Sequence, residues 1–189
     1  KQLEGKGWVY MIKMETERLI LRAFTLEDAE DMYRYAKDER VGPMAGWAPH
    51  ESVEETKDVI RLFVEEKDVW AIVLKETGQV IGSIGLHDRR PDPTIQHEAQ
   101  REIGYVLSPD FWGNGYVPEA VQAMIRFGFE ALGLERIWCG YFSFNDQSRR
   151  VVEKCGFTYA FTKTQELTRL DGRTVECLVY VQLNPTFST

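Results

Sequence analysis

The sequence predicts one domain of the α/β (α+β) class, and three observations carry this prediction. The chain has 189 residues, of which 43% are hydrophobic and 12% aromatic, a size that fits one well-packed core but not two. Segments typical of strands and helices follow one another in the order β-α-α-β-β-β-α-β-α-β-β, so hairpins join some strands and helices join others. No internal repeat, low-complexity segment or linker divides the chain.

The amino-terminal part is predicted to form a strand followed by two helices. Residues 18–24, RLILRAF, are the strand candidate. Thr25 and Asp28 form a weak capping box ahead of the first helix. A loop rich in glycine and proline, VGPMAGWAPHES, ends at Ser52, which caps a second helix with an apolar stripe at helical spacing.

The rest of the chain is predicted to contain six strands and two helices. The helix-like run from Pro118 to Leu132 starts with a proline, which suits a first helical turn, and Gly133 ends it. Asn145 caps a shorter helix that ends before Gly156. The six strands are expected at residues 70–74, 80–86, 101–107, 136–141, 157–167 and 174–183.

Charge and hydropathy exclude several classes of partner. The 23 basic and 30 acidic residues give a net charge of −7, and no Lys/Arg cluster recurs along a helix face. We therefore expect no nucleic-acid partner, and the net charge favours an amine or another cation as substrate. No apolar run approaches the roughly 18 residues of a membrane span, so we expect no membrane partner.

Cysteine usage favours a cytoplasmic location, and the first residues are expected to precede the domain. Cys139, Cys155 and Cys177 form an odd set without CxxC spacing, which fits neither a disulfide framework nor a zinc site. We therefore expect no metal. The segment METERL, which opens the predicted domain of residues 14–184, resembles a natural start, so we expect residues 1–13 to be an extension.

The stretch DFWGNGYVPEA, residues 110–120, lies between a predicted strand and a predicted helix. Such a turn presents unpaired backbone N–H groups and the positive end of the helix dipole, and its glycines let an anion approach closely. A Walker loop would need G-K-[ST], and Pro118 stands where a dinucleotide fingerprint needs its third glycine. The stretch therefore predicts backbone binding of a pyrophosphate that is not cleaved, with an ordinary tight turn as the alternative.

Two motifs together carry a family resemblance. The run REIGYVLSPDFWGNGYVPEAVQAMIRFGFEALGLERI is followed by NDQSRRVVEKCGF. From about residue 15 to residue 183 the chain resembles the GNAT superfamily of acetyl-CoA-dependent N-acetyltransferases, and more narrowly its RimJ/RimL-type branch. The resemblance implies a mixed, twisted, mostly antiparallel sheet flanked by helices, whose central strands EIGYVL and RIWCGY splay apart. Acetyl-CoA, the cosubstrate, would lie between them.

The resemblance also implies which residues hold acetyl-CoA. Backbone groups of Val106, Leu107 and Ser108 would pair with the pantetheine arm as an added strand. The backbone of the glycine loop would hold the pyrophosphate, through Trp112, Gly113, Asn114, Gly115, Tyr116 and Val117. Val117 stands where the family usually has glycine or alanine, a departure that a backbone contact tolerates.

In the second motif, Asn145 and Ser148 are the residues that the resemblance singles out. Asn145 would face the acceptor and the pantetheine, and Ser148 would protonate the departing CoA thiolate. Many members of the superfamily place a tyrosine acid four residues beyond that serine, whereas this chain has Val152 there, as Rim-type members also lack the tyrosine. A helix cap followed by an exposed hydroxyl explains Asn145 and Ser148 equally well locally.

Glu102 is the predicted general base and a predicted acceptor-binding residue. Strand alternation places it on one face with Gly104 and Val106, beside the expected cleft, where a carboxylate can take the proton of an amine. An N–H near Val106 would supply the oxyanion donor. An ion pair with Arg101 or Arg89 is the structural alternative for Glu102.

Other residues are assigned to the acceptor pocket or to the core. Trp47, in the glycine- and proline-rich loop, and His87, at the end of a strand, are expected to wall the acceptor pocket. His87 is also the alternative base. Cys139 has no activating histidine in its segment, so we expect a core residue and not an acyl carrier.

The predicted function is acetyl transfer from acetyl-CoA directly to an amine, with a protein N-terminal α-amine as the favoured acceptor. A small-molecule amine is the close alternative, and a non-catalytic acyl-CoA-binding module is the alternative from another class. The partners are acetyl-CoA and the amine acceptor, and the protein is expected to be a monomer or a homodimer.

Overall fold

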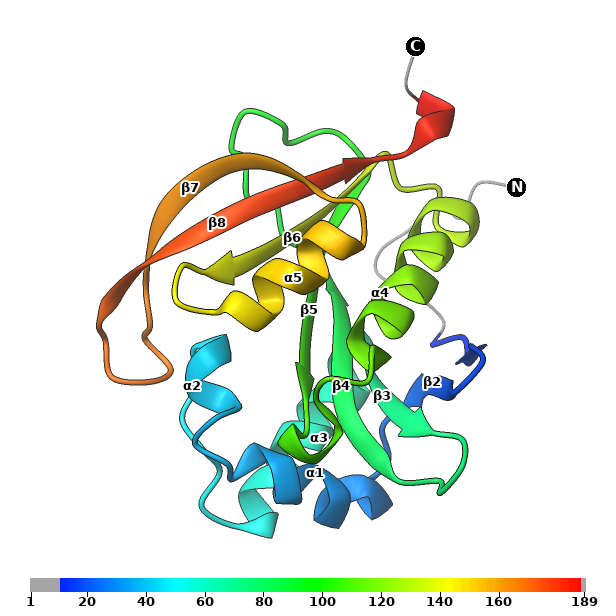
Figure 1. The fold of residues 1–189 in the computed structure, drawn as a ribbon, viewed down its shortest axis with the longest axis vertical. Helices are drawn as coiled ribbons and strands as arrows, with labels where there is room; N and C mark the ends of the chain where they lie inside the picture. The colour runs from blue at the N-terminus through cyan, green and yellow to red at the C-terminus, as the bar shows by residue number, and fades with distance from the viewer. Residues whose placement is uncertain (1–10, 188–189) are drawn as a thin grey trace.

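The computed structural model describes residues 11–187, which fold around one sheet of eight strands (Figure 1). The strands are β1 (Met14–Glu15), β2 (Leu19–Ala23), β3 (Val69–Leu74), β4 (Val80–His87), β5 (Gln100–Leu107), β6 (Arg136–Phe142), β7 (Thr158–Glu166) and β8 (Thr174–Leu183). Their order across the sheet is β1-β2-β3-β4-β5-β6-β8-β7, and each neighbouring pair is antiparallel except β5 and β6, which are parallel. The predicted α/β (α+β) class is confirmed.

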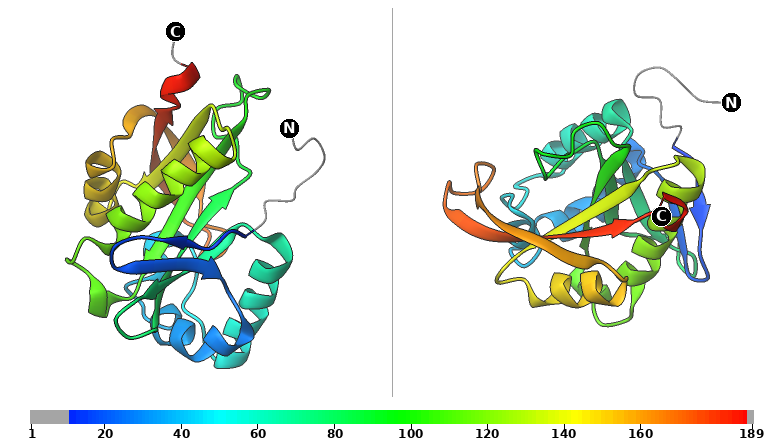
Figure 2. Two further views of the ribbon diagram at one scale, coloured as in Figure 1. Left: turned by 90° about the vertical axis from the view of Figure 1, so that its right-hand side faces the viewer. Right: turned by 90° about the horizontal axis from the view of Figure 1, so that it is seen from above.

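Helices cover both faces of this sheet. They are α1 (Ala29–Ala36), α2 (Gly42–Ala45), α3 (Val53–Glu66), α4 (Tyr116–Arg126) and α5 (Asp146–Lys154). Buried side chains of α1 and α3 form one core cluster with β3, whereas α4 forms another with strands from β2 to β6 on the opposite face. Figure 2 shows this arrangement, with α4 and α5 on one side of the sheet and α3 on the other.

The two central strands part halfway along their length. The pairing of β5 with β6 ends at Ile103 and Cys139, although β5 continues to Leu107 and β6 to Phe142. Over the same stretch, β5 stays paired with β4 and β6 stays paired with β8. The expected splayed pair is therefore present, and Figure 1 shows the two strands diverging.

Local signals predicted most element positions but missed three features. The short strand β1 pairs with β2, and α2 forms inside the loop that was expected to be irregular. The helix expected to begin at Pro118 begins at Tyr116, because Gly115, with φ 77°, takes the N-cap position. The capping box at Thr25 and Asp28 is present. Short helical turns lie at Leu26–Asp28, Pro109–Phe111, Phe127–Ala131 and Pro185–Phe187.

Part of the expected extension contacts the domain. Met11 packs against the larger core cluster, and the indole N–H of Trp70 donates to the carbonyl of Ile12 at 3.1 Å. Residues 1–10 of that segment lie outside the described residues. Within residues 11–187, no helix has the length and the apolar character that a membrane crossing requires.

Candidate active site

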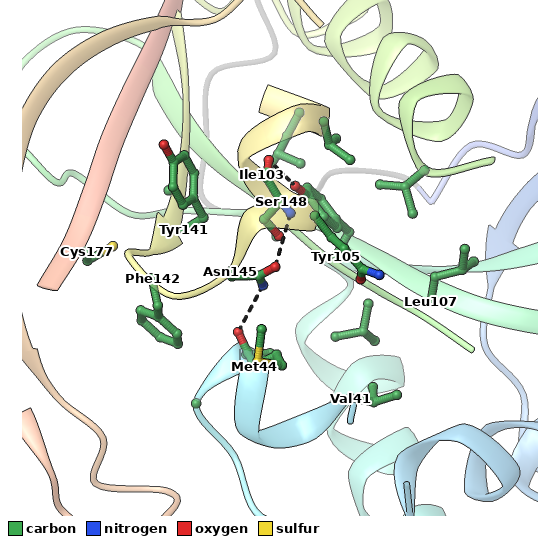
Figure 3. Close-up of a pocket in the computed structure, with 18 of the residues that line it drawn as sticks. Val41, Met44, Ile103, Tyr105, Leu107, Tyr141, Phe142, Asn145, Ser148 and Cys177 are labelled. Carbon is green, nitrogen blue, oxygen red and sulfur yellow. Dashed lines mark hydrogen bonds between the residues drawn. The ribbon is translucent and has the colours of Figure 1, made fainter. Parts of the chain in front are cut away.

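A cavity of about 1140 Å³ opens where β5 and β6 part (Figure 3). One side is lined by β5 from Glu102 to Leu107, and the other by β6 from Gly140 to Phe142. Further walls come from α2, the loop before α4, α5, and the hairpin of β7 and β8. Because β5 and β6 no longer form hydrogen bonds with each other here, backbone groups at the edge of the cavity are open to a ligand.

Gly104 and Gly140 are the first residues beyond the last bonded pair of β5 and β6, and both line the cavity. On the β5 side, a methyl group added at Gly104 would meet the His87 ring at 3.7 Å, an ordinary contact distance. On the β6 side, a methyl group at Gly140 would lie 3.2 Å from the Cys177 sulfur. Because neither residue has a side chain, the sheet face that carries Glu102 is open at the point where the strands part, and we call this opening the glycine window.

The glycine loop has the geometry of an anion cradle. Gly113 and Gly115 have φ values of 78° and 77°, a region that favours glycine. The side-chain amide of Asn114 donates to the carbonyls of Phe111 and Trp112, both at 3.1 Å, which fixes the loop. Within the described residues, the N–H groups of Gly113, Asn114 and Gly115 donate to no backbone carbonyl. They are therefore available to bind an anion at the start of α4.

The first turn of α4 is anchored to the start of the sheet. Glu119 accepts hydrogen bonds from the hydroxyl of Thr16 and from Arg18, whose Nε lies 2.8 Å from Oε1. Burial opposes ionisation of Glu119, but these hydrogen bonds outweigh it and hold the pKa of this carboxyl below its usual value. Arg18 also lies over the ring of Tyr116 at 4.3 Å. Arg18 thus neutralises the negative charge of Glu119. This carboxylate therefore does not prevent an anion from binding at the start of α4.

The register of β5 decides which backbone groups face the cavity. The N–H of Ser108 donates to the carbonyl of Ile81 at 2.7 Å, and the register with β4 is unbroken. Bonded pairs recur at every second residue of an antiparallel ladder, so the N–H and C=O of Val106 are directed toward β4. The same groups of Tyr105 and Leu107 are directed toward the gap. This corrects the expectation for the N–H groups of Val106 and Ser108, whereas the N–H groups of Tyr105 and Leu107, next to Val106, remain candidates for the oxyanion donor.

A chain of hydrogen bonds joins β5, α5 and α2 at the cavity (Figure 3). Asn145 Oδ1 accepts from the N–H of Ser148 at 3.1 Å, and its amide donates to the carbonyl of Met44 at 3.4 Å. The hydroxyl of Tyr105 donates to the carbonyl of Ser148 at 3.4 Å, and burial raises the pKa of Tyr105. Within the described residues, the Ser148 hydroxyl has no hydrogen-bond partner, so it is free to meet a ligand.

Glu102 lies on the cavity wall and pairs with Arg89. The distance from Arg89 Nη1 to Glu102 Oε1 is 3.1 Å, and the Glu102 side chain is 17% exposed while that of Arg89 is 57% exposed. Of the two ion-pair partners that the sequence left open, Arg101 and Arg89, the structure therefore selects Arg89. An exposed guanidinium can swing away with little loss, so the pair does not exclude a proton-accepting role for Glu102.

Four expected site residues are not part of the cavity wall. Trp47 and His87, expected to wall the acceptor pocket, and Ser108 and Asn114, expected to bind the cofactor, are not among the residues that line it. Trp47 forms a bridge with Arg169 at the end of the β7–β8 hairpin. The remaining expected residues do line the cavity: Glu102, Val106, Leu107, Trp112, Gly113, Gly115, Tyr116, Val117, Asn145 and Ser148.

Sequence signals for the other residues of the site are weak. Met44 is held at the cavity by α2, a four-residue helix inside a loop that looked irregular. For Tyr105, strand alternation indicates only that its side chain lies on the opposite face from Glu102. The structure places that side chain beside α5. Lys163 and Arg169 belong to the hairpin of β7 and β8, which no sequence motif connects with the glycine loop.

Cys139 is a core residue, as expected. It is buried and not in a disulfide, and burial raises the pKa of its thiol well above that of a free thiol. A thiol held in its neutral form is a poor nucleophile. In the part of the chain that the structure describes, no three His, Cys, Asp or Glu side chains are grouped as metal ligands would be.

Comparisons with known proteins agree with this geometry. A family model described as Acetyltransferase (GNAT) domain matches residues 18–158. The uncharacterized N-acetyltransferase YoaA of Bacillus subtilis (strain 168) is 35% identical over 149 residues, which cover 76% of this chain and 81% of that protein.

Two solved structures share the fold. The acetyltransferase (GNAT family) from Bacillus anthracis has a TM-score of 0.80 at 24% identity and covers 92% of this chain and 99% of its own. The ribosomal-protein-S5-alanine acetyltransferase from Vibrio fischeri has a TM-score of 0.72 at 22% identity, and the match covers 94% of this chain and 100% of that chain. With the family model matching most of its length, and with a loop, a splayed strand pair and a cavity in the expected places, the chain belongs to the GNAT family of acetyl-CoA-dependent acetyltransferases.

Proposed function

We propose that this enzyme acetylates a protein N-terminal α-amine, in the manner of the RimJ/RimL-type branch. The observation that carries the proposal is a single cavity that holds Glu102, Ser148 and the glycine loop at the point where β5 and β6 part. The structural likeness to an acetyltransferase named for ribosomal protein S5 alanine supports this choice of acceptor.

Acetyl-CoA would enter from the side of α4 and α5. The free N–H groups of the glycine loop suit its pyrophosphate, and the positive end of the α4 dipole adds to their effect. The N–H and C=O groups of Tyr105 and Leu107 suit the pantetheine amides, because β5 has no partner on that side. Leu107 uses one lone pair of its carbonyl for the indole N–H of Trp112 at 2.9 Å, which leaves one free.

The reaction is direct transfer. The amine nitrogen attacks the thioester carbon, the carbon–sulfur bond breaks, and the products are an amide and CoA. Glu102 would take the proton that the amine loses, directly or through water, and Ser148 would give a proton to the CoA thiolate. Solvent then restores both side chains, so protons balance over a turnover. An N–H of β5 beside the glycine window would stabilise the oxyanion.

The basicity of the acceptor favours an α-amine. At pH 7, a lysine-like amine with a pKa of about 10.4 must lose a proton at a cost of about 4.6 kcal/mol, against about 1.4 kcal/mol for an α-amine near 8. A site with one carboxylate as its base is suited to the easier deprotonation.

A turnover screen tests the proposal. Purified protein and acetyl-CoA are incubated with peptides that carry free N-termini, with the same peptides blocked at the N-terminus, and with small amines, and products are identified by mass spectrometry. We expect acetylation at the free α-amine. Turnover confined to small amines would replace this acceptor by the small-molecule alternative. Acetyl-CoA binding without turnover of any amine would favour the non-catalytic binding module.

A further inference from the structure

The wall of the cavity is basic, although the protein is acidic. Seven basic and three acidic side chains line the cavity, whereas the whole chain has a net charge of −7. Three of the basic side chains, Arg40, Arg89 and Arg90, pair with nearby carboxylates. The other four have no ion-pair partner within the described residues: Arg150, Lys154, Lys163 and Arg169. Acetyl-CoA is itself anionic, so the position of each of these four side chains indicates whether it would bind acetyl-CoA or the acceptor.

Two of the four lie beside the expected position of the CoA phosphates. Arg150 and Lys154 are one turn apart on α5. The sulfur of Cys155, the next residue, lies 3.8 Å from the carbonyl of Pro118 in the first turn of α4. These two cations are therefore next to the glycine loop and suit the phosphates of the cosubstrate.

Lys163 lies on the face of the sheet opposite the one that α4 and α5 cover. Paired residues of adjacent strands share a face, as do alternate residues of one strand. Lys163 stands opposite Cys177, and Cys177 stands opposite Phe142 on β6. Phe142 shares its face with Trp138, whose partner on β5 is Glu102. The side chains of Lys163 and Glu102 therefore face the same side of the cavity, and the Lys163 residue is partly buried.

Arg169 lies at the end of the same hairpin. Its carbonyl accepts a hydrogen bond from the N–H of Ala48 at 3.0 Å, which ties the hairpin to the loop after α2. The backbone of Arg169 is thus fixed while its side chain is exposed and lines the cavity. Glu166, the acidic lining residue of this hairpin, lies near the position of Gly172 at the turn. Within the described residues, neither of the two hairpin cations, Lys163 and Arg169, therefore has a carboxylate partner.

We infer that the amine acceptor carries a carboxylate that Lys163 and Arg169 bind, so that acidic acceptors are the preferred substrates. An ammonium that has no ion-pair partner within the described residues, on the side of the cavity that Glu102 faces, favours an incoming anion and repels a polyamine or a lysine-rich peptide. This inference rests on the proposed acetyltransferase function. The carboxylate has two possible sources, an acidic side chain near a peptide N-terminus or the α-carboxylate of a free amino acid.

The test compares matched acceptors. Ser-Glu-Glu, Ser-Gln-Gln and Ser-Lys-Lys peptides share the same first residue, and alanine and alaninamide differ in the carboxylate. We expect kcat/KM for the Glu peptide to exceed that for the Gln peptide by about tenfold at low salt, and the ratio to fall as salt screens the charges. A preference for alanine over alaninamide would identify a free amino acid as the source. Alaninamide has the less basic amine, so basicity alone predicts the reverse order.

Variants assign the preference to residues. The double variant Lys163→Gln/Arg169→Gln is expected to reduce the Glu/Gln ratio to below about threefold, because kcat/KM for the Glu peptide falls more than kcat/KM for the Gln peptide. Two matched controls apply. Lys57→Gln, on α3 and outside the cavity wall, should leave the Glu/Gln ratio unchanged. Lys154→Gln should raise the KM for acetyl-CoA and also leave the Glu/Gln ratio unchanged.

Equal turnover of the Glu, Gln and Lys peptides by the wild-type protein, or an unchanged ratio in a folded double variant, would overturn the inference. Failure of the proposed function looks different, because no amine would then be acetylated although acetyl-CoA binds.

Discussion

His87 and Asp68 form a hydrogen-bonded pair, with 2.7 Å between Nδ1 and Oδ2, on the sheet face that also carries Glu102. Burial opposes ionisation of Asp68, but the hydrogen bond to His87 outweighs it and keeps the pKa of Asp68 below its usual value. In the neutral ring, an Nδ1–H donated to the Asp68 carboxylate would leave Nε2 as the proton-accepting nitrogen. The His87 ring covers Gly85 and lies near Gly104, so it stands beside the glycine window. Glu102 in the cavity wall and His87 beside it are thus the two candidate proton acceptors, and variants can separate them.

Glu102→Gln is expected to lower kcat by about 10²- to 10⁴-fold, because the amide keeps the shape but cannot take a proton. Acetyl-CoA affinity should stay unchanged, since the expected CoA contacts are backbone groups. Rates measured from pH 5 to pH 9 should show a weaker or shifted acidic limb in the variant.

His87→Gln is the matched comparison for Glu102→Gln. If Glu102→Gln stays within about twofold of wild type with an intact pH profile while His87→Gln loses activity, His87 is the base and Glu102 is structural.

Gly104→Ala is expected to leave folding intact and to lower kcat/KM by about tenfold or more, because its methyl group narrows the glycine window. That methyl group would lie 3.7 Å from the His87 ring, an ordinary contact distance, so no strain is expected in the folded protein. Thermal melting and steady-state kinetics on the same preparation check both parts. Wild-type kinetics in the variant would show that the window is not the meeting point of amine and thioester.

Gly115→Val is expected to weaken acetyl-CoA binding by at least about tenfold. A branched side chain at a φ of 77° strains the N-cap of α4 and moves the N–H groups that would bind the pyrophosphate. Calorimetric titration measures the loss. Gly78→Val, at a φ of 73° in the β3–β4 turn, imposes similar strain away from the cavity and should keep wild-type affinity.

Acetyl-CoA is expected to bind with the same affinity in the presence of a chelator, because backbone N–H groups and not a metal would hold the pyrophosphate. Titrations of chelator-treated protein and of untreated protein give the comparison. A loss of affinity that added divalent metal restores would show that a metal takes part.

Asp28→Asn is expected to destabilise the fold by about 1–3 kcal/mol at pH 7, because Asp28 accepts two hydrogen bonds from Arg22, at 2.8 and 2.9 Å, and one from the N–H of Thr25. Burial opposes ionisation, but these bonds outweigh it, so the folded pKa of Asp28 lies below the unfolded one. This stabilisation is therefore present above the unfolded pKa and is lost as pH falls through the folded pKa. Urea unfolding should show the difference between variant and wild type shrinking below about pH 4.

Asp58→Asn is the control for this prediction, since Asp58 forms only an exposed pair with Arg61 on α3. Its effect on the free energy of unfolding should stay within about 0.5 kcal/mol at any pH. An effect of Asp28→Asn that is as small as the control's would show that the capping box does not stabilise the fold.

The sequence by itself determined the features that depend on neighbouring residues. Thr25 and Ser52 cap helices as expected, and Asn145 caps α5 through the N–H of Ser148. Gly113 and Gly115 adopt the positive φ values that their loop needs. Each of these is decided within about four residues of chain, because caps and turns satisfy backbone groups locally. That is why the element order and the glycine loop could be predicted.

Only the tertiary structure decided which groups meet at the cavity. The register between β4 and β5 turns the N–H of Val106 away from the gap, and one residue of slip would have turned it inward. Arg89 and not Arg101 reaches Glu102, because the turn after β4 brings it across. The hairpin of β7 and β8 adds Lys163 and Arg169 to the cavity wall, where basic side chains outnumber acidic ones although the chain as a whole is acidic. Net charge is a sum over residues, whereas the field at a site depends on which of them the fold brings within a few ångströms.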